Sequence, residues 1–127
     1  MMVCKLVQNT STVARYMSEA DLAVTSGGRT VFELASLHVP TMVIAQNDRE
    51  ATHSFVRNSP SVVYCGQMGQ ISKDSFVNTF RQLVEGDLLR EKMRQFLAEV
   101  DLRRGTDRVL EIIRMAITAS EQKKPCR

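Results

Sequence analysis

The sequence predicts an α/β domain in which short parallel strands alternate with helices. Four short apolar runs have the length of buried strands, and each precedes a segment with the spacing of a helix. The chain has 127 residues, 43% of them hydrophobic, which is enough for one compact core. Because such elements connect by crossovers, we expect a parallel sheet with helices on both faces. The predicted strands are Val3–Val7, Leu22–Thr25, Thr41–Ala45 and Val62–Cys65.

The first two predicted helices are short. Val13, Met17 and Ala20 share one helical face, and Ser11 or Thr12 precedes them as a capping residue. The second helix begins near the arginine that follows the glycine pair, and a proline then ends it before the third strand. Its apolar positions are Val31, Leu34 and Ala35.

Three C-terminal helices are defined by longer apolar stripes. Gly86-Asp87 and Gly105-Thr106 separate them, with a glycine to end one helix and an Asp or Thr to cap the next. We therefore predict a single domain over residues 1–121 and a polar tail over residues 122–127. The stripes are Phe76, Phe80, Leu83 and Val84; Leu89, Met93, Phe96 and Val100; and Val109, Ile112, Ile113, Ala116 and Ile117.

Composition and charge argue against several classes of function. A net charge of +3 without clustered Lys or Arg, 6% aromatic residues and no Trp disfavour nucleic-acid binding. Three cysteines in distant positions are predicted to be free thiols, and with only two histidines they form no metal-ligand set, so we expect no metal and no cofactor. No apolar stretch approaches the roughly 20 residues of a membrane span, and the N-terminus has no signal pattern, which favours a cytoplasmic location.

The first candidate site is the loop Ser26-Gly27-Gly28-Arg29, between a predicted strand and helix. Glycines let the backbone approach a ligand without Cβ clashes, and the start of a helix presents N–H groups to an anion. Glu33 lies one turn into that helix, where its carboxylate could reach a sugar hydroxyl. The alternative is a tight turn that binds nothing.

The second candidate site is the loop after the third predicted strand, residues 46–53. It supplies amide, carboxylate, guanidinium and imidazole groups within two turns, at Asn47, Arg49, Glu50 and His53. The alternative is a solvated surface helix with Asp48 as its cap. Since ligands of open parallel sheets bind beyond the carboxyl ends of the strands, the two loops are predicted to form adjacent walls of one cleft.

Residues 20–44 resemble the C-terminal, Rossmann-like half of GT-B fold glycosyltransferases, which binds nucleotide sugars. That half has an Ala-Asp strand, a Ser-Gly-Gly-x-Thr-x-x-Glu-Leu turn and helix, and a Gly-x-Pro strand; here His38 replaces the glycine. Residues 46–55 and 105–113 are similar to the UDP-sugar hydrolase of the pseudaminic acid pathway and to spore-coat polysaccharide proteins. In the latter, this module is fused to a sialic-acid-type cytidylyltransferase. The similarity covers about residues 13–113.

The resemblance implies that the ligand is a UDP-sugar or related nucleotide sugar, used in surface polysaccharide or sialic-acid-like sugar biosynthesis. It implies that Glu33 accepts hydrogen bonds from the ribose, and it leaves the catalytic residues unknown. The residues implied to hold the diphosphate are Ser26, Gly27, Gly28 and Thr30, with Arg29 beside them to neutralise phosphate charge. Those implied to face the sugar are Asn47, Glu50 and His53.

The resemblance also implies that this chain acts together with a further domain or subunit. In the family, two further strands and another glycine-rich loop begin this half, and the hydrolase keeps its catalytic base in a separate N-terminal domain. If Val3–Val7 and Leu22–Thr25 correspond to strands 3 and 4 of the usual sheet order 3-2-1-4-5-6, the two strands that should lie between them are absent. We therefore expect an isolated chain without turnover, which needs a missing domain or a partner subunit. Its free strand edge invites pairing with Val3–Val7, with a second copy as a homodimer, or with a partner.

Three classes of function follow. The first is the binding module of a UDP-sugar hydrolase or glycosyltransferase. The second is a binding or assembly subunit that keeps the fold without turnover. The third is a flavodoxin-like regulatory domain whose glycine turn is only structural; a phosphoacceptor domain needs acids after its first strands, whereas Asp21 precedes its strand.

Overall fold

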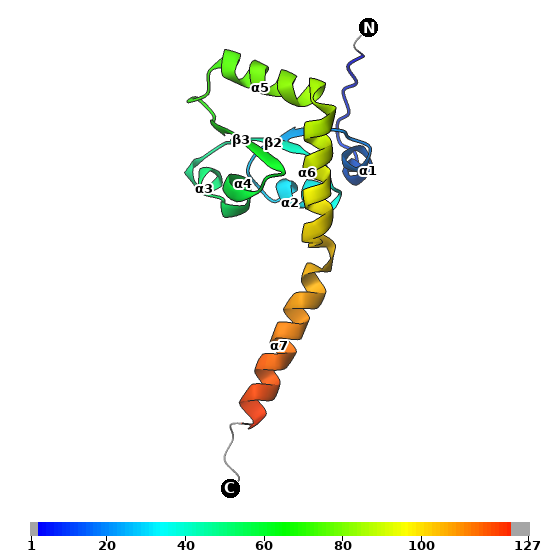
Figure 1. Cartoon of the computed structure of the whole chain (residues 1–127), viewed down its shortest axis with the longest axis vertical. Helices are drawn as coiled ribbons and strands as arrows, with labels where there is room; N and C mark the ends of the chain where they lie inside the picture. Colours follow the sequence, from blue (N-terminus) through cyan, green and yellow to red (C-terminus); the bar gives the residue numbers. More distant parts are fainter. Residues whose placement is uncertain (1–2, 123–127) are drawn as a thin grey trace.

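The computed structural model describes residues 3–122, and its strands form one parallel sheet in the order β1-β2-β3 (Figure 1). β1 (Ala23–Thr25) pairs with β2 (Thr41–Ala45), which pairs with β3 (Val62–Gln67). The predicted α/β class with a parallel sheet is confirmed. Three of the predicted strands agree with these bounds to within two residues at each end.

Helices cover both faces of the sheet, as predicted. Neighbouring residues of β2 contribute to opposite faces, so this central strand is buried on both sides. The core cluster on one face contains Val31, Val43 and Val56, and the cluster on the other contains Met42, Leu83 and Met93. The helices that supply these clusters are α2 (Thr30–Ser36), α4 (Ser54–Asn58), α5 (Lys73–Glu85) and α6 (Asp87–Val100).

The predicted strand Val3–Val7 is wrong. These residues are exposed and have no strand conformation, and they precede the short helix α1 (Val13–Ser18). An isolated apolar run gains nothing from extending unless a sheet edge accepts its N–H and C=O groups. Instead, the Lys5 ammonium lies 5.5 Å from the centroid of the Tyr16 ring. Within residues 3–122, β1 therefore pairs on one side only.

His38 has a backbone conformation that favours glycine. Its φ of 60° is left-handed, and it follows the end of α2. The His38 N–H donates to the Ala35 carbonyl at 3.0 Å, and the Val39 N–H donates to the Leu34 carbonyl at 3.0 Å. This is the Schellman pattern of hydrogen bonds, which places a left-handed residue just past the helix.

We expect His38→Gly to raise the free energy of unfolding by about 0.5–1 kcal/mol. Glycine removes the strain of the left-handed conformation, and this gain exceeds the cost of the higher conformational entropy that glycine gives the unfolded chain. Urea denaturation of the wild type, the glycine variant and His38→Ala measures this. The alanine variant keeps the strain and is the control. A glycine variant less stable than the alanine variant would contradict the prediction.

The boundary between the last two helices differs from the prediction. α6 ends at Val100, and Asp101 follows it with a left-handed φ of 47°. A single 3₁₀ turn η1 (Leu102–Arg104) then leads directly into α7 (Gly105–Gln122). Gly105 is therefore the first residue of a helix and does not end one, because the aspartate already provides the left-handed residue. Of the predicted tail, residue 122 belongs to α7, and residues 123–127 lie outside the described part.

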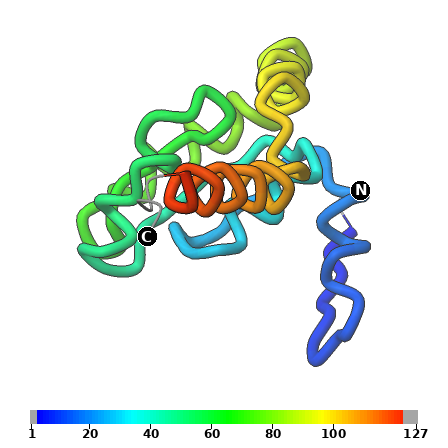
Figure 2. The backbone as a smooth tube through the Cα atoms, turned by 90° about the horizontal axis from the view of Figure 1, so that it is seen from below, coloured from blue at the N-terminus to red at the C-terminus, as the bar shows by residue number. Residues whose placement is uncertain are grey.

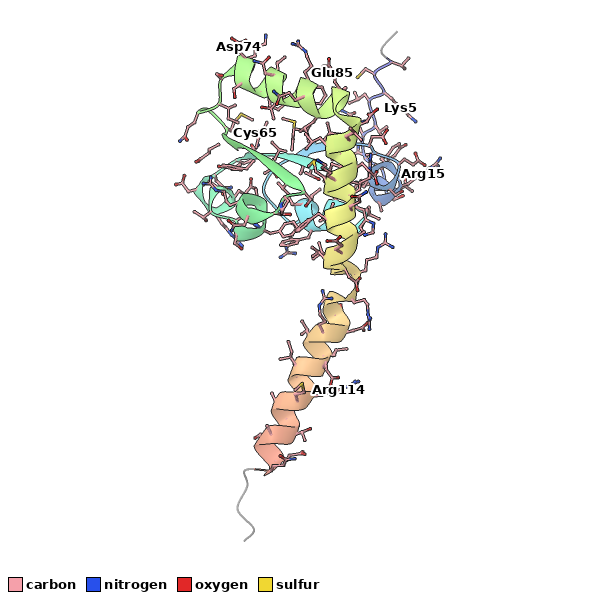
Figure 3. All side chains as sticks on the ribbon, viewed as in Figure 1. Lys5, Arg15, Cys65, Asp74, Glu85 and Arg114 are labelled. Carbon is pink, nitrogen blue, oxygen red and sulfur yellow. The ribbon has the colours of Figure 1, made fainter. Side chains whose placement is uncertain are left out.

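α7 extends away from the sheet and its covering helices, as Figure 1 shows; in Figure 2, seen from below, it lies in front of them. Its predicted apolar stripe forms a helix, but within residues 3–122 nothing buries it, and Figure 3 shows its side chains standing clear of the rest. Arg114 marks the middle of this exposed helix in Figure 3. Exposed apolar side chains on α7 are Val109, Leu110, Ile112, Ile113, Met115 and Ile117. In residues 3–122, no helix has the length and apolar character needed to cross a bilayer.

Cys65 of β3 lies between the sheet and α5 (Figure 3), where it packs against the cluster of Met42, Leu83 and Met93. Burial raises the pKa of this thiol above 9.0. We expect iodoacetamide at pH 8.5 to label Cys65 about tenfold more slowly than the exposed Cys4, because the thiolate is the nucleophile.

The same pKa shift links Cys65 to stability. Because the folded state favours the protonated thiol, the contribution of Cys65 to the free energy of unfolding is constant below pH 9.0 and is lost as the pH rises through the raised pKa.

In the labelling experiment, mass spectrometry of tryptic peptides follows the modification of each cysteine. Equal rates in the folded chain would contradict the burial of Cys65, and equal rates in urea are the control.

Candidate functional site

The two predicted loops form one pocket at the carboxyl ends of β1 and β2. We call this cavity of about 310 Å³ the loop pocket. Both Gly28, after β1, and Asn47, after β2, line it, so the prediction that these loops are adjacent walls is confirmed. The lining residues are Gly27, Gly28, Arg29, Phe32, Asn47, Arg49, Glu50 and His53.

Glu50 joins the two walls. It lies in the one-turn helix α3 (Asp48–Ala51), and its Oε2 accepts hydrogen bonds from the Gly27 N–H at 3.0 Å and the Gln46 N–H at 2.8 Å. One carboxylate oxygen thus connects the loop after β1 to the loop after β2. A charged acceptor on two backbone donors is a strong arrangement, and it fixes the separation of the walls.

The two glycines have different local roles. Neither has a positive φ, so the turn itself does not require glycine. A Cβ on Gly27 would lie 3.0 Å from the Glu50 Cβ and 3.1 Å from its carbonyl oxygen, so Gly27 is required for the close approach of α3. A Cβ on Gly28 would meet its nearest atoms only at 3.8 Å. Gly28 therefore leaves open space on the pocket side.

Asn47 and His53 begin consecutive short helices. The Asn47 Oδ1 accepts the Glu50 N–H at 3.0 Å and caps α3, a place that the sequence assigned to Asp48 in the unliganded alternative. The Asp48 carboxylate instead accepts a hydrogen bond from the Gln67 amide at 3.0 Å. The His53 Nδ1 accepts the Val56 N–H at 3.5 Å and caps α4. Both capping side chains retain donors, the Asn47 Nδ2 and the His53 Nε2.

Three of the predicted site residues do not line the pocket. Ser26 and Thr30 flank the glycine loop and are half-buried. Glu33 is exposed on α2 and lies outside the lining. The pocket brings together the other six, which are Gly27, Gly28, Arg29, Asn47, Glu50 and His53.

Sequence reasoning missed one lining residue, Phe32, and gave a second, Arg49, no role toward the ligand. Phe32 is 42% exposed although it is a large apolar residue at the start of a helix. The available signal was its position beside the buried stripe of α2 and three residues after the arginine of the glycine loop. Arg49 was named as the guanidinium group of the second loop, but only Asn47, Glu50 and His53 of that loop were expected to contact the ligand.

The charged side chains of the pocket favour an anionic ligand. Arg29 and Arg49 are exposed, whereas the Glu50 carboxylate is turned to backbone donors. The two guanidinium groups and the one carboxylate of the lining leave one net positive charge. Guanidinium groups match phosphate oxygens in geometry as well as in charge. Among residues 3–122, no three His, Cys, Asp or Glu side chains gather in a cluster suited to a metal ion.

Comparison of the chain with models of known protein families, with curated proteins and with solved structures finds no match.

Proposed function

We propose that the chain is the nucleotide-diphosphate-sugar-binding module of a UDP-sugar hydrolase or glycosyltransferase-like protein, in the synthesis of surface polysaccharide or sialic-acid-like sugars. The observation that carries this proposal is the loop pocket, where the glycine pair and Arg29 on one wall face Arg49 and a set of hydrogen-bonding side chains on the other, at the ends of parallel strands. The resemblance of the Ser-Gly-Gly to Glu-Leu segment to nucleotide-sugar-binding proteins supports the choice of ligand.

The pocket divides the ligand between its walls. Gly28 leaves room for a diphosphate next to the backbone, and Arg29 and Arg49 supply the opposite charge. The Asn47 Nδ2 and the His53 Nε2 are donors for hydroxyl groups. This assignment keeps the predicted roles of the glycine loop and of the second loop. In this assignment, Glu33 contacts the ligand only if the ribose extends beyond the pocket lining and over α2.

A specific observation favours a binding role without turnover for this chain alone. The two lining side chains suited to general-base work are tied to the backbone through Glu50 Oε2 and His53 Nδ1, which leaves Glu50 Oε1 as the remaining carboxylate acceptor of the pair. In the proposal, another domain or a partner subunit therefore supplies the catalytic base. The same observation keeps a non-catalytic assembly subunit as the second candidate function.

Calorimetry with UDP and UDP-N-acetylglucosamine tests the proposed function. We expect saturable binding that weakens with added salt. Arg29→Ala and Arg49→Ala are each expected to lower the affinity about fivefold, since each removes one partly solvated charge-assisted contact. Arg81→Ala, which removes an exposed arginine from the distant α5, is the matched control and leaves the affinity unchanged.

Two results separate the candidates. Binding of neither nucleotide by the wild type would exclude the proposed ligand class. If the purified chain consumes UDP-N-acetylglucosamine, measured as the release of free sugar, the chain carries its own catalytic base. Binding without consumption agrees with the module and with the assembly subunit, and adding a candidate partner domain then distinguishes these two.

A further inference from the structure

One wall of the loop pocket is aromatic. Phe32 lines the pocket and is 42% exposed. Its ring centroid lies 5.2 Å from that of His53 and 5.1 Å from that of Phe55. Phe55 itself packs against the buried cluster that contains Val43. This partly exposed side chain is therefore positioned by contacts with a pocket histidine and with a phenylalanine anchored in the core.

His53 has a defined hydrogen-bonding state at this wall. Its Nδ1 accepts the Val56 N–H, so the neutral ring has its proton on Nε2. His53 thus serves the pocket as a donor and not as an acceptor. The pocket places this donor next to the Phe32 ring, with the side-chain amide of Asn47 in the same lining.

We infer that Phe32 is the stacking platform for the sugar ring of the bound nucleotide sugar, and that the His53 Nε2–H donates to one of the hydroxyls of that ring. This inference rests on the proposed function, which assigned the second loop to the sugar but gave Phe32 no role. One face of a pyranose consists of C–H bonds, which are complementary to the negative face of an aromatic ring. Its hydroxyls project around the rim, where hydrogen-bond donors are needed.

The geometry favours a sugar over a nucleobase at this wall. A nucleobase sandwiched between two rings needs a parallel surface on each side, whereas the rings of Phe32 and His53 are inclined by 51°. Phe32 and Phe55 are inclined by 32°, and Phe55 is packed toward the core. The wall therefore offers a partly exposed aromatic side chain beside hydrogen-bond donors. This combination suits a ring that is apolar on one face and polar at its edge.

Paired titrations of the 127-residue chain test the inference. UDP and UDP-N-acetylglucosamine are titrated by calorimetry into the wild type, Phe32→Leu and Phe32→Tyr. Leucine keeps an apolar side chain of similar size but has no aromatic face, whereas tyrosine keeps the face. We expect Phe32→Leu to weaken UDP-N-acetylglucosamine binding about fivefold to tenfold and to leave UDP affinity within about twofold. Phe32→Tyr is expected to bind both as the wild type does.

A second measurement does not depend on a variant. Selective saturation of the aromatic protons in the wild type is expected to transfer to the protons of the N-acetylglucosamine ring. Absence of that transfer while the ligand is bound would contradict the inference even if Phe32→Leu failed to fold. Thermal unfolding of each variant identifies any affinity loss that comes from unfolding.

The outcomes separate the inference from the proposed function. An equal loss of UDP and UDP-N-acetylglucosamine affinity in Phe32→Leu would place the ring against the nucleoside half, so the sugar platform is wrong and the proposed function remains. Unchanged affinity for both ligands would also overturn the platform alone. Failure of the wild type to bind either ligand would overturn both.

Discussion

Replacing Gly27 with alanine is expected to lower the free energy of unfolding by about 1–3 kcal/mol, whereas alanine at Gly28 is tolerated. The added Cβ at Gly27 would meet the Cβ and the carbonyl oxygen of Glu50 at 3.0 and 3.1 Å. Neither atom is the free end of a flexible side chain. The loop or α3 must therefore shift, and the shift strains the Gly27 hydrogen bond to Glu50.

Gly28→Ala is the matched control, one residue away in the same loop. Its Cβ has ordinary contacts at 3.8 Å, and its φ is not positive. We expect its stability to stay within about 1 kcal/mol of the wild type, with any gain coming from the lower entropy of the unfolded chain. Urea denaturation of both variants measures the difference. Equal destabilisation would mean that the loop requires glycine for its turn and not for the approach of α3.

The sheet could be predicted because each of its strands has a recognisable local sequence pattern. Thr41–Ala45 follows a proline and is apolar in all but its first residue, and its observed bounds are those predicted. Val3–Val7 has a similar local pattern and is not a strand. The difference is the partner: a strand forms where a neighbouring edge accepts its hydrogen bonds, and the pattern of one run contains no information about that edge.

The last helix shows the same limit at the level of packing. The spacing of Val109, Ile113 and Ile117 predicts an amphipathic helix, and α7 is one. Periodicity identifies the apolar face but not the surface that covers it. In residues 3–122 that face stays exposed, so helix formation and burial are separate predictions, and only the first could be made from the sequence.

The position of the site was predictable, whereas its internal contacts were not. Parallel strands bring the loops after β1 and β2 together by topology alone. The hydrogen bond from Gly27 to Glu50 joins residues 23 positions apart, and no local spacing rule indicates it. Phe32 was missed because the helical pattern assigned it to the boundary of the buried stripe, where exposure depends on what the second loop places beside it.

Removing the Glu50 carboxylate is expected to separate the two walls of the loop pocket. In Glu50→Ala, the N–H groups of Gly27 and Gln46 lose their shared acceptor. Gly27 is buried, so water does not readily accept a hydrogen bond from its N–H. Gln46 is exposed, so water can accept the hydrogen bond from its N–H. Because of that difference, we expect a loss of about 2 kcal/mol in the free energy of unfolding, near the value of one charge-assisted hydrogen bond and not two.

Amide hydrogen exchange gives the more direct measurement, since it reads each donor separately. In Glu50→Ala the Gly27 amide is expected to lose its protection, and in Glu50→Gln, whose carbonyl oxygen still accepts, it keeps most of it. Glu33→Ala removes an exposed carboxylate from α2 without touching either amide, so it is the control. If Gly27 stays protected in Glu50→Ala, another acceptor holds the loop, and the glycine pair is positioned by the strand ends themselves. Loss of protection together with weaker UDP-N-acetylglucosamine binding would instead make the carboxylate of Glu50 a positioning group for the ligand, because it sets the distance between the walls without needing to touch the phosphates.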